Sequence, residues 1–228
     1  MPYRRTDNVV RRLAAREQAI LDSATALAAE GGMTAVQMTA IAARASVAAG
    51  TVYRYFPSKA DLVAAVIDAL SRRELAALRD AAARAPGPLS ALAACIATFA
   101  ARACYARRLI WAATGEPAEA EIDPLRRAFR QSLAAEFAHR IEAAFRTGHL
   151  SEVDAHLAAS AVLGALLEGL VGPLAPAAES APAQRQAVQA ATLLVLRSLG
   201  IVDARARGLV AQCALPPNER AAEAQHVA

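Results

Sequence analysis

Glycine and proline constrain the fold of this chain most strongly, because the eleven residues of each type gather at a few points. Both residues break helices, and the stretches between these points carry apolar residues at the three- and four-residue spacing of amphipathic helices. Alanine fills about a quarter of all positions and aromatic residues only 4%, a composition that favours packed helices. No segment alternates apolar and polar residues as a strand would. We therefore expect an all-α protein.

The breakpoints predict about nine helices, arranged as an N-terminal three-helix head and a C-terminal helical-bundle body. A capping-box pattern at Ser58–Asp61 opens a long helix that continues to Pro86. Asp123 and Pro124 suit the start of a later helix, and 151–154 forms a second capping-box pattern. The helices are expected over about 7–30, 37–44, 48–55, 59–86, 89–104, 105–114, 124–148, 151–171 and 183–199.

Positive charge is concentrated in the N-terminal quarter of the chain. The net charge of +4 arises entirely within residues 1–59, which hold eight basic and four acidic residues, whereas the rest holds seventeen of each. No acidic residue lies between Glu30 and Asp61. A positive segment on a neutral body is typical of polyanion-binding proteins, although a solvated surface with chance asymmetry would look the same. We expect three regions: a head over 1–60, a body over 61–200, and a partly disordered C-terminal extension over 201–228.

Cysteine usage and hydropathy favour a cytoplasmic protein. Cys95, Cys104 and Cys213 are widely spaced and contain no Cys-x-x-Cys pair, which argues against a disulfide framework or a zinc cluster. The longest charge-free run, residues 85–101, contains a Pro-Gly-Pro break and is shorter than the roughly 20 residues that a membrane span requires. The charged N-terminus has no apolar stretch behind it, so we expect neither a secretory signal nor a membrane span.

The two short helices at 37–44 and 48–55, resting on the long first helix, form the pattern of a helix-turn-helix. Val52 and Phe56 take the inward positions of the second short helix, which leaves its start and outer side free for contacts. Small residues at its start let the helix N-terminus approach a duplex closely, and hydroxyl groups there can donate to phosphates. The candidate residues are Ala49, Gly50, Thr51, Tyr53, Arg54 and Tyr55. Tyr53, Tyr55 and Phe56 form an aromatic cluster at this point, for which the alternative is ordinary core packing.

The run Gly50-Thr-Val-Tyr-Arg-Tyr-Phe-Pro-Ser-Lys59, together with the segments 20–33 and 41–62, resembles the DNA-binding domain of TetR/AcrR-family transcriptional regulators. The resemblance covers about residues 14–72, and the helix-turn-helix itself about 37–56. It implies an all-α homodimer with a helix-turn-helix head and a larger ligand-binding body.

By position, the resemblance implies that Thr51 and Tyr53 touch DNA from the recognition helix, that Tyr55 binds the DNA backbone and that Lys59 binds a phosphate. Ala49 falls where the family often contacts a base, and Thr39 would contact DNA from the preceding helix. Lys59 is the single lysine beside 24 arginines, which suggests that a compact ammonium group is needed there.

Two residues depart from the family pattern, and an N-terminal arm extends it. Gln37 stands where a Ser or Thr helix cap is usual, and Ser46 stands where the turn usually has Gly. Ser46 is expected to be accommodated only if its φ is not positive. Arg4 and Arg5 could form an arm that enters the minor groove, although a disordered basic tail is the alternative.

The body shows no pattern of an enzyme. The four histidines, His139, His149, His156 and His226, have neither metal-ligand nor carboxylate spacing, and no Ser or Cys lies in a nucleophile elbow. There is no Gly-rich phosphate loop. We expect no enzyme activity, no metal and no cofactor.

The large apolar residues of the body are candidates for a small-molecule pocket, because such pockets are mostly apolar. Glu168 is a lone charge in the apolar segment 163–171. If buried, it needs a partner, either an arginine such as Arg197, which we favour, or a ligand. The aromatic residues could equally fill the core. The candidate pocket residues are Phe99, Tyr105, Trp111, Phe129, Phe137 and Glu168.

The helices at about 151–171 and 183–199 are apolar on more than one face, so they must be buried on several sides. Pairing with the same helices of a second copy would bury them, as the family resemblance implies, and an internal bundle in a monomer is the alternative. The sequence therefore predicts a dimeric regulator that binds an operator in double-stranded DNA, most simply a repressor released by a small, largely apolar effector. The competing hypothesis is an all-α ligand carrier or interaction protein that has lost DNA binding.

Overall fold

The computed structural model describes residues 7–117, 120–151 and 154–216. Within these ranges the chain forms ten α-helices, one short 3-10 helix and no strand, which confirms the all-α expectation with one helix more than the nine predicted. The head and the helix that leaves it comprise α1 (Asp7–Gly31), η1 (Met33–Ala35), α2 (Met38–Arg44), α3 (Ala49–Tyr55) and α4 (Lys59–Ala83). The body comprises α5 (Pro88–Tyr105), α6 (Arg107–Thr114), α7 (Asp123–Arg146), α8 (Ala155–Leu170), α9 (Ala181–Ser198) and α10 (Asp203–Gln212).

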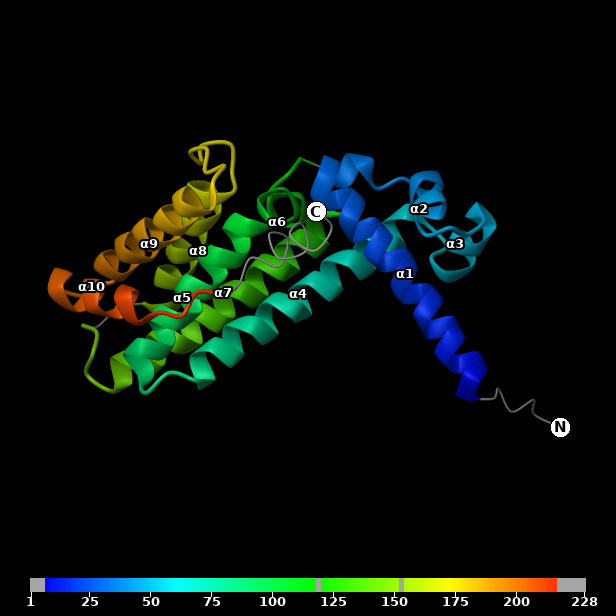
Figure 1. The fold of residues 1–228 in the computed structure, drawn as a ribbon. Helices are drawn as coiled ribbons and strands as arrows, with labels where there is room; N and C mark the ends of the chain where they lie inside the picture. The colour runs from blue at the N-terminus through cyan, green and yellow to red at the C-terminus, as the bar shows by residue number, and fades with distance from the viewer. Residues whose placement is uncertain (1–6, 118–119, 152–153, 217–228) are drawn as a thin grey trace.

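The head sits at one end of an elongated molecule, with α2 and α3 at the tip and α1 passing beneath them (Figure 1). Ile20 of α1, Ile41 of α2 and Val52 of α3 are fully buried and form its small core. The helix α4 starts in the head and continues along the body, where it packs against α5 and α7. Its start is the predicted capping box: the Ser58 hydroxyl accepts from the Asp61 N–H and the Asp61 carboxylate accepts from the Ser58 N–H, both at 3.1 Å.

The body is a bundle built around α5, which packs against α4, α7 and α9. Phe99 of α5 and Phe137 of α7 are fully buried and meet edge to face, with ring centroids 5.9 Å apart. By length and composition alone α5 could cross a membrane, but 72% of it is buried inside the protein. It is therefore the core helix of the bundle.

Three helix starts in the body differ from the predicted ones. Ile122, not Asp123, precedes the first helical residue of α7. The cap of α8 is Asp154, whose carboxylate accepts from the N–H groups of His156 at 2.9 Å and Leu157 at 3.0 Å. Ser180 caps α9 and starts it two residues early. The C-terminal extension contains the well-packed helix α10, with Ala206 and Leu209 buried, because it lies against α9 and α5.

Buried ion pairs join the long helices of the body. The Glu74 carboxylate, 1% exposed on α4, accepts from Arg102 of α5 at 2.6 and 2.9 Å. Glu136 of α7 accepts from Arg79 of α4 at 2.9 Å and from Arg140 at 2.6 Å. Burial raises the pKa of Glu136, but the hydrogen bonds from the two arginines outweigh it and leave the pKa below its usual value. Glu136 therefore remains charged at neutral pH.

Candidate nucleic-acid interface and effector site

The turn of the helix-turn-helix is a helix C-cap with an unusual residue. Ala45 is the C-cap that follows α2, and the N–H of Val47 donates to the carbonyl of Ala42 at 2.9 Å, which is the long hydrogen bond of a Schellman motif. Ser46 takes the left-handed position of this motif with φ 53° and is the only described non-glycine residue with positive φ. The expectation that Ser46 avoids positive φ is therefore wrong, because the motif requires that conformation.

The recognition helix α3 faces outward with the predicted residues. Val52 is buried beneath it, whereas Tyr53 is 51% exposed and Arg54 is exposed beside it. Ala49 and Thr51 are half-buried. A Cβ built on Gly50 would meet no atom within 4 Å, so nothing in the protein requires glycine there. Thr39 on α2 is also exposed. The start of α3 is thus an open, small-residue surface.

Tyr55 does not fit the expected role. Its side chain is half-buried against the hydrophobic core, and its hydroxyl is buried without a hydrogen-bond partner. The guanidinium of Arg54 lies 5.6 Å from the centre of its ring. In this structure the hydroxyl is therefore not presented to a DNA backbone.

Several charged side chains of the head are already engaged within the protein. Arg44 forms a two-point ion pair with Glu30 at 2.5 and 2.7 Å, so this arginine is already neutralised. Asp61 is held in the capping box with Ser58, and the half-buried Lys59 is the first residue of α4. Gln37, which stands where the family pattern has a Ser or Thr cap, makes no side-chain cap for α2; its amide instead donates to the carbonyl of Thr34 at 2.9 Å.

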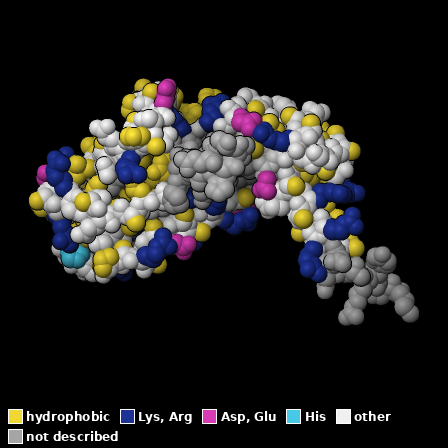
Figure 2. Space-filling model, in the orientation of Figure 1, with side chains coloured by type: hydrophobic (Ala, Val, Ile, Leu, Met, Phe, Trp, Pro, Cys, Tyr) yellow, Lys and Arg dark blue, Asp and Glu magenta, His cyan; other side chains and the backbone are white. Residues whose placement is uncertain are grey.

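The N-terminal half of α1 adds exposed positive charge at the same end of the molecule. Figure 1 shows this half projecting past the rest of the head, and Figure 2 shows Lys and Arg side chains along it. They belong to Arg11, Arg12 and Arg16, all exposed. Arg4 and Arg5 lie outside the described residues.

A polar joint that the sequence did not reveal connects the head to the body. The Glu116 carboxylate, after α6, accepts from the backbone N–H of Met33 at 2.9 Å and from Arg108 at 2.7 Å. Arg108 also donates to the carbonyl of Gly31 at 3.1 Å. Gly32 has φ 75° and ψ −170°, a conformation almost restricted to glycine. A Cβ at Gly32 would collide with the Arg108 and Glu116 side chains.

The predicted pocket residues do not line a common cavity. Phe99, Phe129 and Phe137 are buried in the core, and Trp111 packs its ring on Gly115. Tyr105 is half-buried beside a different, polar hollow near α9 and α10. The three phenylalanines therefore fill the core, as the alternative interpretation held, whereas Tyr105 borders that hollow.

The prediction for Glu168 is wrong because this residue is exposed within a single chain. The suggested partner Arg197 pairs instead with Asp203. Glu168 lies on the outer face of α8, so its isolation among apolar residues reflects an unpaired helix face rather than an internal site.

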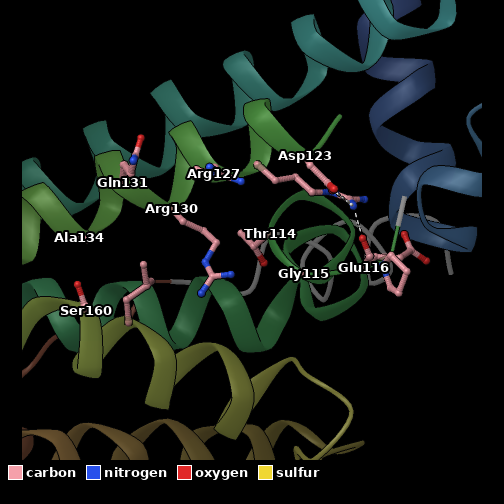
Figure 3. Close-up of a pocket in the computed structure, with 12 residues that line it drawn as sticks. Thr114, Gly115, Glu116, Asp123, Arg127, Arg130, Gln131, Ala134 and Ser160 are labelled. Carbon is pink, nitrogen blue, oxygen red and sulfur yellow. Dashed lines mark hydrogen bonds and ion pairs between the residues drawn. The ribbon is translucent and has the colours of Figure 1, made fainter. Parts of the chain in front are cut away.

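A cavity of about 470 Å³ lies instead between the start of α7, the end of α6 and the middle of α8 (Figure 3). Arg126 is buried at its edge, and its guanidinium donates to the carbonyls of Ala112 at 2.7 and 3.1 Å and of Glu116. Burial lowers the pKa of Arg126, yet arginine remains charged. The cavity thus touches Glu116, the residue that holds the head–body joint.

Residues that could support other chemistry are not gathered together. Among the described residues, no three His, Cys, Asp or Glu side chains are placed to hold a metal ion. Cys95 and Cys104 are buried, and burial raises the pKa of the Cys95 thiol to about 12, so it is protonated at neutral pH.

The outer faces of α8 and α9 carry exposed apolar residues. Leu157 of α8 is 69% exposed and Leu194 of α9 is 63% exposed. Ala161 and Ala165, four and eight residues after Leu157, are also exposed on α8. This surface coincides with the pair of helices that the sequence predicts to be buried on several sides.

A helix-turn-helix head on an all-α body is an arrangement found in DNA-binding regulators, and the comparisons find similar proteins of this class. Residues 20–66 match the family of bacterial regulatory proteins, tetR family. The HTH-type transcriptional repressor KstR of Rhodococcus jostii (strain RHA1) is 56% identical over 57 residues, which cover 25% of this chain and 26% of KstR. KstR of Mycobacterium tuberculosis (strain ATCC 25618 / H37Rv) is 54% identical over 52 residues, or 23% and 24% of the two chains. The chain thus spans about a quarter of the length of these curated relatives.

Solved structures extend the likeness to the body. RolR in complex with resorcinol aligns with a TM-score of 0.63 and 22% identity over 91% of this chain and 98% of that chain. The fatty acid degradation regulator FadR from Bacillus halodurans aligns with a TM-score of 0.70 and 20% identity, over 82% and 97%. Residues 20–66 are thus similar in sequence to the tetR family, and the chain shares its fold with solved structures that include a TetR/AcrR-family regulator from Thermobifida fusca, with a TM-score of 0.64 and 21% identity over 80% of this chain and 97% of that chain.

Proposed function

We propose that this protein is a cytoplasmic, dimeric, sequence-specific DNA-binding repressor whose body binds a small effector. The observation that carries the proposal is the open start of α3, where Gly50, the half-buried Thr51 and the exposed Tyr53 face outward. The two carboxylates nearest to α3 in the sequence, Glu30 and Asp61, are engaged by Arg44 and Ser58. A helix start of this kind can approach DNA closely, because no side chain of the protein occupies the space. The match of residues 20–66 to the tetR family of regulatory proteins supports the same role.

Within the proposal, base and backbone contacts have different sources. Thr51, Tyr53 and Ala49 contact bases or the adjacent backbone from α3, and Thr39 contacts the backbone from α2. Lys59 binds a phosphate at the start of α4. Tyr55 takes part only if its buried hydroxyl moves outward on binding. Arg4 and Arg5, outside the described residues, stay proposed as a minor-groove arm.

Dimerisation is proposed through the exposed faces of α8 and α9. Leu157, Ala161 and Ala165 on α8 and Leu194 on α9 would be covered by the same faces of a second copy. A two-fold axis would relate the two heads, so the operator should contain two half-sites with the same symmetry.

The head–body joint provides a route by which an effector could weaken DNA binding. The joint links the Met33 N–H to Glu116, whose backbone carbonyl also accepts from Arg126 at the cavity. An effector that prefers one arrangement of these groups would shift the position of the head, and DNA would in turn weaken effector binding by the same factor. The likeness to RolR, which binds resorcinol, supports a small-molecule effector.

Fluorescence anisotropy with labelled DNA from upstream of the protein's own gene tests the proposal. The double variant Tyr53→Ala with Lys59→Ala should lose specific binding, and the logarithm of the association constant should fall steeply with the logarithm of salt concentration. Phe145→Ala, an exposed aromatic residue of the body, is the matched control and should bind normally. Specific binding that survives the double variant contradicts the assigned interface. A weak DNA affinity with no salt dependence would favour the ligand-carrier alternative.

A further inference from the structure

Two arginines in the cavity beside α7 have no partner among the described residues. Arg127 and Arg130 lie one helical turn apart, and both are exposed. Figure 3 shows Arg130 extending from α7 toward α8. No hydrogen bond or ion pair involves either side chain within the described ranges, whereas the other arginine of the cavity, Arg126, is fully engaged by backbone carbonyls.

The carboxylates of the cavity do not neutralise this pair. Glu116 is directed away from it, toward the Met33 N–H and Arg108. Asp123 makes its ion pair with Arg126, at 3.9 Å. The cavity therefore holds an excess of positive charge at Arg127 and Arg130.

The two arginines disfavour each other on the helix. Arg127 and Arg130 lie three residues apart on α7, and like charges at this spacing on one helix face repel each other. An anion between them would relieve this repulsion, and arginine forks suit carboxylate and phosphate oxygens.

The rest of the cavity can hold the body of a small molecule. Its volume of about 470 Å³ lies within the usual range for small-molecule sites. Gln131 and Ser160 add polar groups, while Ala134, one turn after Arg130 on α7, and Leu163 of α8 provide an apolar surface. We propose that the cavity binds an effector that carries a carboxylate or phosphate group, with its anion between Arg127 and Arg130 and its apolar part on Ala134 and Leu163.

This inference changes the expected chemistry of the effector from largely apolar to anionic. Its regulatory meaning rests on the proposed function, because Glu116 belongs both to the cavity and to the head–body joint. Binding of the anion itself does not depend on DNA binding and can be measured without it.

The single tryptophan of the chain, Trp111, offers a direct measurement, because its ring packs on Gly115 at the wall of the cavity. The full-length protein is titrated with pyrophosphate in one series and decanoate in another, at ionic strength held constant with sodium chloride. Tryptophan fluorescence is recorded, and isothermal calorimetry gives an independent dissociation constant. We expect saturable binding of at least one probe; a response to pyrophosphate alone indicates a phosphate group, and one to decanoate alone a carboxylate.

The variants Arg127→Gln and Arg130→Gln separate a specific site from general charge. Because each removes charge-assisted hydrogen bonds, the double variant should bind the probe about tenfold more weakly or worse. Arg205→Gln, which removes an exposed arginine of α10 without a described partner, should bind the probe as the parent protein does. Absence of binding by both probes, or equal affinity in the double variant and the parent, overturns the inference.

A third measurement distinguishes failure of this inference from failure of the proposed function. Operator binding is measured by anisotropy without and with the probe. The double variant should bind DNA as tightly as the parent without probe but should no longer be released by it. If the parent binds the probe and no DNA, the anionic site stands and the proposed regulatory function fails.

Discussion

The head and the body of this molecule are held together in different ways. The head is stabilised by short-range backbone motifs and a small apolar core. These features are the Ser58–Asp61 capping box, the Schellman turn at Ser46 and the buried packing of Ile41. In the body, buried charges join helices that are distant in sequence, as Glu74 and Arg102 do. Local motifs can be inherited as a unit, which agrees with the tetR-family match covering residues 20–66, the head and the start of α4.

The largest expected effect on stability comes from breaking a buried ion pair of the body. Arg102→Met leaves the Glu74 carboxylate, 1% exposed, with only Arg73 at 3.4 Å. Breaking a buried pair in this way should lower the free energy of unfolding by about 3–5 kcal/mol, measured by urea denaturation. Asp68→Asn, which breaks the exposed pair with Arg72, is the control and should cost about 0–1 kcal/mol.

A second substitution tests whether the loss of stability comes from the unpaired buried charge. Adding Glu74→Leu to Arg102→Met removes both charges, so the double variant should be more stable than Arg102→Met alone. Equal or greater loss in the double variant would show that the pair is held by shape rather than by charge.

The next effect concerns the joint where the two regions meet. Gly32→Ala forces a conformation that only glycine readily adopts and places a methyl group against Arg108 and Glu116. Strain and the loss of a charge-assisted hydrogen bond should together lower the free energy of unfolding by about 2–4 kcal/mol. Thermal unfolding gives the loss, and anisotropy shows whether the effector still releases DNA.

Gly148→Ala provides the matched control for this joint. Its φ is also positive, at 73°, but a Cβ there meets nothing within 4 Å. It should therefore show only the backbone strain, about 1 kcal/mol. If the two variants lose equal stability, the contacts of Gly32 with Arg108 and Glu116 contribute nothing.

The difference between short-range and long-range contacts also separates what the sequence could predict from what it could not. The helices, the capping box and the outward face of α3 depend on residues within a few positions of one another, and the structure confirms them. The joint could not be predicted, because Glu116 lies 83 residues from Met33 in the chain. The apolar surroundings of Glu168 could mark a buried helix or an exposed helix face, and only the packing shows the second. Aromatic residues likewise do not reveal whether they line a cavity or fill a core.

A smaller effect tests the turn of the head. Ser46→Gly removes the cost of a left-handed serine, and it should raise the free energy of unfolding by about 1 kcal/mol. Ser132→Gly, inside α7, should have the opposite sign, because glycine destabilises a helix interior by about 0.5–1 kcal/mol. Urea denaturation of both variants gives the comparison, and destabilisation by Ser46→Gly would show that the serine is held by contacts that the backbone angle does not reveal.

The substitution with the smallest expected effect on stability, Gly50→Ala, should have a large effect on DNA binding. It therefore separates folding from recognition at the start of α3. Gly50→Ala places a methyl group in open space, so it should stabilise the helix by at most about 1 kcal/mol. The same methyl group occupies the space through which we propose DNA approaches, so operator affinity should fall while the melting temperature rises. Gly208→Ala in α10, also open within 4 Å, should gain similar stability and bind DNA as the parent does. A stabilised Gly50→Ala variant with full operator affinity would mean that DNA does not come close to the first turn of α3, and the recognition surface would then have to be sought further along the helix, around Tyr53 and Arg54.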